Sequence, residues 1–135
     1  MRYDLSLIFD LCNELGLSST LANERLEITF RPGVNLCFLN ADRVEDCLVG
    51  FDGTPWHTHD DFMFVDGDGN SIELNYFDTV AGLTDGQILI CERWQSGAVA
   101  DRWLIHRDCN DFNHEFKYME GSEELRVWRP ERKST

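Results

Sequence analysis

Two histidines separated by one residue, His57 and His59, are the side chains best suited to bind a metal ion. If this segment is extended, both imidazoles point to one face, as a metal site built on a strand requires. Zinc needs three or four ligands, and the other candidates have no recognised spacing from this pair. These candidates are Asp60, Asp61, Cys47 and His106. We therefore expect the histidines to hydrogen-bond locally and stabilise a turn, with no cofactor, and we keep a metal-dependent enzyme as the alternative.

The adjacent carboxylates of Asp60 and Asp61 would suit acid and base chemistry if burial separated their pKa values. Adjacent residues on a strand face opposite sides, however, so the two carboxylates do not converge on one substrate atom. We therefore expect two solvated acids beside a buried Phe62.

Nucleophilic catalysis would need a cysteine beside a histidine. Cys91 or Cys109 could meet His106 or His114 across a hairpin, but no flanking motif supports such a pair. A cysteine on a strand is more often a small core residue.

The Gly67-x-Gly69 pattern lacks the later glycine, the lysine and the long helix of a phosphate-binding loop. We therefore predict that the protein is not an enzyme.

The charge distribution is the clearest feature of the sequence. The formal net charge is -13, and residues 44–92 contain no lysine or arginine. An anionic surface repels nucleic acid phosphates and anionic lipid headgroups, so we expect neither nucleic acid nor membrane as a partner. A basic protein partner is favoured instead. The acids of this segment are Glu45, Asp46, Asp52, Asp60, Asp61, Asp66, Asp68, Glu73, Asp78, Asp85 and Glu92.

Within this acidic segment, Trp56 lies among turn-forming residues and carboxylates. An aromatic anchor beside carboxylates that receive arginine or lysine is typical of an interaction hot spot. The alternative for this tryptophan is burial in the core or on a sheet face, as for Trp94, Trp103 and Trp128. From charge and turn position, we predict the following partner-facing residues: Asp52, Trp56, Asp60, Asp61, Asp66 and Asp68.

The run from Asp66 to Asn70 resembles the start of a calcium-binding loop, because its aspartates alternate with glycines. The loop would need glycine where Ser71 stands and a bidentate glutamate where Phe77 stands. We therefore reject a calcium site and predict a hairpin turn.

Hydrophobic spacing predicts an amphipathic helix over residues 3–15, ended by Gly16, and a second, short helix over residues 76–83. Alternating apolar residues and turn signals predict strands around these helices. The predicted strands lie in residues 26–30, 34–39, 44–51, 62–65, 72–74, 88–94, 99–106 and 125–128. We expect a single α+β domain over residues 1–135, with both helices packed on a mainly antiparallel sheet of about six or seven strands.

Five cysteines lie far apart without a C-x-x-C pair, which matches neither a zinc knuckle nor a disulfide framework. Reduced thiols in a cytosol explain this usage most simply. The amino end lacks the apolar core of a secretion signal, and no apolar run approaches the roughly 20 residues of a membrane span. We therefore expect a cytoplasmic protein.

In size, acidity and helix-plus-sheet pattern, the chain resembles the immunity proteins of bacterial toxin systems, including contact-dependent inhibition. The resemblance implies a binding protein that blocks a cognate basic toxin, for example a nuclease whose active site normally holds phosphates. It assigns no site residue. The alternatives are the metal-dependent enzyme and a cytosolic adapter without a toxin partner, and a toxin gene beside this one would separate the adapter from an immunity protein.

Overall fold

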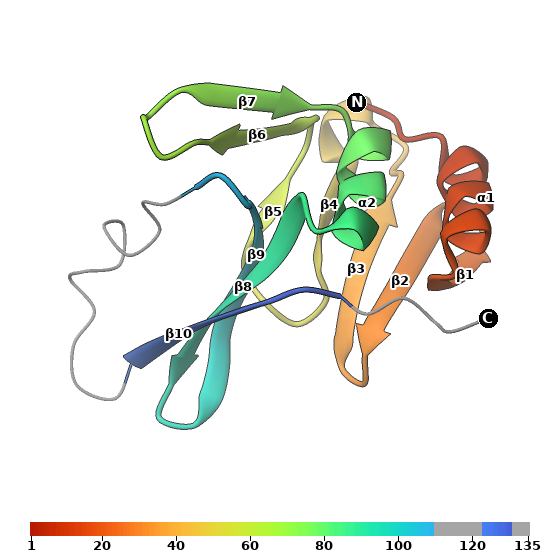
Figure 1. The fold of residues 1–135 in the computed structure, drawn as a ribbon. Helices are drawn as coiled ribbons and strands as arrows, with labels where there is room; N and C mark the ends of the chain where they lie inside the picture. Colours follow the sequence, from red (N-terminus) through yellow and green to blue (C-terminus); the bar gives the residue numbers. More distant parts are fainter. Residues whose placement is uncertain (110–122, 131–135) are drawn as a thin grey trace.

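The computed structural model describes residues 1–109 and 123–130 (Figure 1). This part of the chain forms two α-helices, α1 (Leu5–Leu15) and α2 (Tyr76–Asp85), and a short 3-10 turn, η1 (Val44–Asp46). The strands are β1 (Ser18–Ala22), β2 (Arg25–Arg31), β3 (Val34–Leu39), β4 (Leu48–Phe51), β5 (His57–Thr58), β6 (Phe62–Val65), β7 (Ser71–Leu74), β8 (Ile88–Gln95), β9 (Ala98–His106) and β10 (Glu123–Trp128). The predicted α+β class with an N-terminal helix is confirmed.

The strands form three antiparallel sheets in the described chain. One has the order β1-β2-β3-β4-β5, another the order β10-β8-β9, and β6 and β7 form a two-stranded hairpin. The sequence predicted about six or seven strands in mainly one sheet. The structure has ten described strands in three sheets, and the short β1 and β5 account for part of the difference.

The helix α1 forms because its ends are capped and one face is apolar. The Asp4 side chain accepts a hydrogen bond from the Leu7 amide, and Gly16 ends the helix in the left-handed conformation with φ of 72°. The helix α1 packs mainly on β1 and α2, with a smaller contact to β2. Its buried face consists of Leu5, Ile8, Leu11 and Cys12.

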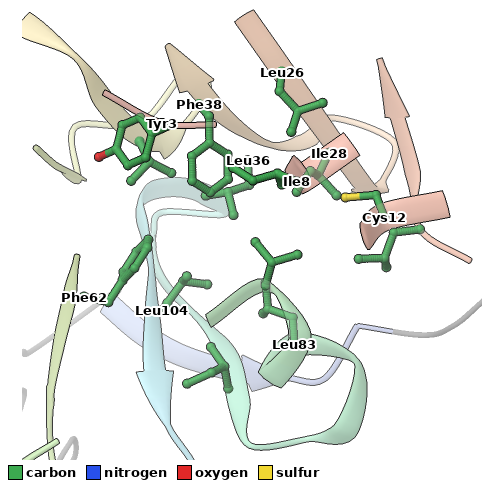
Figure 2. Packing of buried hydrophobic residues seen from close by; sticks show 14 of the residues in the cluster. Tyr3, Ile8, Cys12, Leu26, Ile28, Leu36, Phe38, Phe62, Leu83 and Leu104 are labelled. Atoms are coloured by element: carbon green, nitrogen blue, oxygen red, sulfur yellow. The ribbon is translucent and has the colours of Figure 1, made fainter. Parts of the chain in front are cut away.

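One hydrophobic core joins both helices and all three sheets. Phe38 of β3 and Ile28 of β2 are fully buried and lie close to Ile8 of α1 (Figure 2). Leu83 of α2 and Leu104 of β9 close the core from the other side (Figure 2). Burying each such side chain contributes about 1.5–3 kcal/mol, so this cluster positions the surface strands discussed below.

Three local predictions need correction. Residues 44–46 form η1 and not the start of a strand, because Glu45 pairs with Arg43 across a tight turn. This contact also lowers the pKa of Glu45 below its usual value. The strands β1 and β5 were not predicted, because β1 is rich in serine and threonine and β5 has two residues. Both are formed by backbone pairing with a neighbouring strand, which leaves little apolar periodicity in the sequence.

A buried ion pair lies on the core side of the three-stranded sheet, although no sequence pattern indicated it. Arg102 Nε donates to Glu92 Oε2 at 2.7 Å, and the Trp94 indole donates to Glu92 Oε1 at 3.2 Å. Both charged side chains are almost fully buried. Cross-strand pairing of Glu92 with Arg102 in β8 and β9 makes this contact possible.

The last described strand, β10, is held to the rest of the molecule by arginines. The Arg126 guanidinium lies 3.9 Å from the Trp94 ring centroid, and Arg31 of β2 lies 3.7 Å from that of Trp128. Arg129 donates to the Thr84 carbonyl at 3.2 Å, near the C-terminal end of α2. In the part of the chain that the structure describes, neither helix has the length and apolarity needed to cross a membrane.

Candidate functional site

The segment from Gly50 to Asp61 is shaped by a close approach of two backbone strands. Gly50 of β4 pairs with His57 of β5. A Cβ atom added at Gly50 would lie 2.6 Å from the Trp56 carbonyl oxygen and 2.9 Å from the His57 Cβ. Glycine is therefore required here so that β5 can reach the edge of the five-stranded sheet.

Trp56 is half-buried and packs against the core. Its ring centroid lies 6.1 Å from that of Phe51 and 6.2 Å from that of Phe62. Its amide donates to Asp101 Oδ1 at 3.0 Å, which ties the loop to β9. These contacts anchor the loop. The contact between Trp56 and a partner stays a prediction.

Of the two histidines, His57 makes the local hydrogen bond expected from the sequence, whereas His59 bonds to a residue 12 positions away along the chain. The His57 Nδ1 lies 3.0 Å from the Pro55 carbonyl oxygen, and the His59 Nδ1 lies 2.9 Å from that of Cys47. The two rings meet edge to face, with centroids 5.1 Å apart. Because a carbonyl only accepts, both Nδ1 atoms act as donors. In residues 1–109 and 123–130, no group of three or more histidine, cysteine or acidic side chains is arranged to hold a metal ion.

A pocket of about 270 Å³ lies beside this segment, on the face of the five-stranded sheet that carries Cys37 and Gly50. The Arg25 guanidinium lies 3.2 Å from the Cys37 sulfur and 3.9 Å from an Asp52 carboxylate oxygen. Burial is the main reason that the pKa of Cys37 is raised to about 11. The thiol therefore remains protonated at neutral pH, which makes it a poor nucleophile.

The adjacent acids Asp60 and Asp61 have different environments. The Asp60 side chain is 79% exposed and lies 3.9 Å from the N-terminal amine. Asp61 is half-buried, and its Oδ1 accepts a hydrogen bond from the Tyr76 amide at 3.0 Å, in the first turn of α2. Asn75 caps the same helix through the Asp78 amide. Asp61 therefore has a structural contact that Asp60 lacks.

We predict that Asp61→Ala lowers the free energy of unfolding by about 0.5–2 kcal/mol, as expected for the loss of a side-chain cap. Asp60→Ala is the matched control and should change it by less than about 0.5 kcal/mol, since its carboxylate is exposed. Urea unfolding of both variants measures the difference. Equal stability of the two variants would show that the contact with Tyr76 contributes nothing.

The hairpin β6–β7 carries the other two predicted acids at its turn. The Asp66 Oδ1 accepts hydrogen bonds from the amides of Asp68 and Asn70, both at 2.9 Å. The bond from Asn70 is the largest cause that lowers the pKa of Asp66. Its carboxylate therefore shapes the predicted hairpin turn, whereas Asp68 is exposed and forms no ion pair with another described residue.

The outer face of this hairpin is unusually apolar for an exposed strand pair. Met63 is 64% exposed and Val65 is 42% exposed, both on the same face of β6. Glu73 lies directly opposite Met63 in the strand register. The opposite face is buried, with the Phe62 and Phe64 rings stacked at 6.0 Å. Residues 62–65 are all apolar in the sequence, so no sequence signal separated the exposed Met63 and Val65 from the buried Phe62 and Phe64.

The structure does not gather all the predicted acids into one site. Asp52 lies in the turn after β4, beside Arg25, whereas Asp66 and Asp68 lie at the turn of β6–β7. Figure 1 shows the turn after β4 below the centre of the view and the β6–β7 turn at the upper left. Asp60 and Asp61 lie at the start of β6, so the predicted set is divided between separate regions.

The suggested cysteine and histidine pair is only partly within the described residues. Cys109 donates its amide to the His106 carbonyl at 2.9 Å, and His106 Nδ1 accepts from the Asp108 amide at 3.1 Å. These contacts form a turn at the end of β9. Cys91 and Cys109 are both buried, and His114 lies outside the described residues.

A comparison of the chain with models of protein families found no match, and neither did searches of curated proteins and of solved structures. Function must therefore be inferred from side chains and their geometry.

Proposed function

We propose that the protein is an acidic binding protein that neutralises a basic protein partner, as an immunity protein blocks its cognate toxin. The observation that carries this proposal is the segment of residues 44–92, which has no lysine or arginine and places exposed carboxylates on the β6–β7 hairpin. Opposite charge speeds the capture of a partner and selects against wrong ones.

The exposed acids of the hairpin are available for such a partner. Asp68 and Glu73 are exposed and form no ion pair with another described residue. Asp60, which precedes β6, lies 3.9 Å from the N-terminal amine. By contrast, Glu92 is already paired with Arg102. The free carboxylates can therefore receive arginine or lysine without first breaking a contact between two side chains.

The hairpin also has a defined shape. Its turn is stabilised by the hydrogen bonds to Asp66, and its inner face is buried through Phe62 and Phe64. A surface that is ordered before binding loses less conformational entropy when the partner arrives. The exposed Met63 and Val65 add apolar area between the carboxylates, as in the core of many protein interfaces.

The test is a charge reversal at two exposed acids that have little structural role. The double variant Asp68→Lys with Glu73→Lys, both in the hairpin, should bind the cognate basic toxin at least about tenfold more weakly, mainly through slower association. Association and dissociation rates are measured by biolayer interferometry at two salt concentrations, and protection of cells that express the toxin is scored in parallel.

The matched control reverses two exposed acids on α1, Asp10→Lys with Glu14→Lys, and makes the same change in net charge. This control should bind the toxin almost as well as the unchanged chain. If both double variants lose affinity equally, only net charge matters and the hairpin is not the binding surface. If the unchanged chain does not bind the toxin at low salt, the proposed function is wrong.

A further inference from the structure

A groove of about 200 Å³ lies between β6 and β9, two strands that belong to different sheets. Met63 and Val65 line it from β6, Trp103 and His106 line it from β9, and Trp56 also contributes. Within the described chain, β6 pairs only with β7 and β9 pairs only with β8. Each strand therefore has one edge without a strand partner among these residues.

The open edge of β6 faces the groove. The Asp66 amide donates to the Asn70 carbonyl at 2.9 Å, which makes these two residues a hydrogen-bonded pair of the β6–β7 ladder. Hydrogen-bonded and non-hydrogen-bonded pairs alternate along an antiparallel ladder. The register therefore leaves the backbone amides and carbonyls of Met63 and Val65 pointing away from β7.

The edge of β9 that is not paired with β8 also faces the groove. The Arg107 amide donates to the Gln87 carbonyl at 2.8 Å, so the alternation directs the backbone groups of Leu104 and His106 away from β8. Asp108 lies two residues after His106, and its backbone carbonyl accepts a hydrogen bond from the Gly67 amide at 2.8 Å. This bond joins the two edges at one end of the groove. Beyond it, the backbone groups of Met63 and Val65 have no strand partner among the described residues, whereas the His106 carbonyl accepts from the Cys109 amide.

The charge around the joined end is mainly negative. Asp66 and Asp68 occupy the hairpin turn next to Gly67, and the Asp108 side chain is exposed. Hydrogen bonds to its carboxylate hold the pKa of Asp66 below the usual value, so this acid remains ionised well below neutral pH. Among the described residues, Arg107 places a cation here, with its Nε 4.0 Å from Asp108 Oδ1.

We propose that this groove binds an extended, basic segment of the partner protein, which adds as a strand along the open edge of β6. The backbone groups of Met63 and Val65 would supply the main-chain hydrogen bonds, as in other cases of strand addition. Their exposed side chains would cover the apolar side chains of the added strand, and the acids at the turn would receive its lysines or arginines. This inference rests on the proposed function, because it names the surface and the segment that the basic partner would use.

The test uses a synthetic peptide of about six residues, the length of an ordinary strand, that alternates lysine and valine. The full chain labelled with nitrogen-15 is titrated with this peptide, and amide shifts are followed by NMR. We expect the largest shifts at Met63, Val65, Leu104 and His106, with binding that weakens as salt is added. A peptide that alternates glutamate and valine should produce no shifts.

A proline variant tests the direction of the backbone groups. Val65→Pro removes an amide that points into the groove and leaves the β6–β7 ladder bonds in place, so peptide affinity should fall at least about tenfold. Ser71→Pro is the matched control, because Ser71 pairs with Val65 and its amide points outward at the β7 edge, away from β6 and the groove. Affinity of this control should stay within about twofold of the unchanged chain, a small difference in binding free energy.

The outcomes separate this inference from the proposed function. Shifts confined to other strands, or equal affinity of the two proline variants, would contradict binding in the groove. Neither result would contradict the proposal of an acidic binding protein. Toxin binding without any peptide binding would also overturn the groove. Self-association of the chain that Val65→Pro abolishes would identify a second copy as the occupant and overturn the proposed partner segment. Because the shift map uses the unchanged chain, a proline variant that fails to fold does not remove the test.

Discussion

Replacing Arg102 with methionine is expected to lower the free energy of unfolding by about 3–5 kcal/mol. The Arg102 and Glu92 side chains retain only 8% and 6% exposure, and their charged atoms lie 2.7 Å apart. Without the guanidinium, the Glu92 carboxylate keeps the Trp94 indole as its described hydrogen-bond donor. A buried charge without its counter-charge is costly, so the variant should unfold at a much lower urea concentration.

Two further variants identify the cause. The double variant Glu92→Met with Arg102→Met removes both charges and should be more stable than Arg102→Met alone. Arg43→Met breaks an exposed ion pair with Glu45 and should cost less than about 1 kcal/mol. If Arg102→Met is no more destabilising than Arg43→Met, the buried pair does not stabilise the fold as described.

Replacing Gly50 with alanine should destabilise the protein by about 1–3 kcal/mol, the usual cost of forcing an extra methyl group into a packed region. The new Cβ would lie 2.6 Å from the Trp56 carbonyl oxygen, which is a backbone atom. The chain must therefore shift β5 and move Trp56 away from Phe51 and Phe62. We expect a lower urea midpoint together with a changed near-ultraviolet circular dichroism spectrum.

The matched control for Gly50→Ala is Leu48→Ala, on the same face of β4 and beside the same pocket. It removes bulk instead of adding it, so it should leave the pairing of β4 with β5 unchanged. Protection against hydrogen exchange of the Thr58 amide, which pairs with Val49 in the β4–β5 ladder, distinguishes the two variants. Loss of protection in Leu48→Ala, or full protection in Gly50→Ala, would contradict this account of the glycine.

Much of the local structure could be predicted because its cause lies within a few residues. The spacing of Leu5, Ile8 and Cys12 predicts α1, and Gly16 predicts its end. The turn from Asp66 to Asn70 predicts the β6–β7 hairpin, because Asp66 bonds to amides only two and four residues later. These features need no distant partner, so short-range patterns are sufficient.

The structure gave different roles to acids that look equivalent in the sequence. Asp60 and Asp61 are adjacent, but only Asp61 meets the Tyr76 amide, 15 residues away along the chain. The partner of Glu92 is Arg102 across a hairpin, and the neighbour of Trp56 is Asp101 from β9. Charge patterning alone cannot distinguish an exposed carboxylate from one that already accepts a hydrogen bond or forms an ion pair within the fold.

The sequence by itself therefore determined the α+β class, α1, the main hairpins and the long segment without positive charge. Only the tertiary structure decided which acids remain free, why Gly50 must lack a side chain, and that β6 and β9 present open edges to one groove. The physical reason is that capping, turn formation and net charge are local or additive properties. Ion pairing, close backbone approach and strand edges depend on residues that folding brings together from distant parts of the chain.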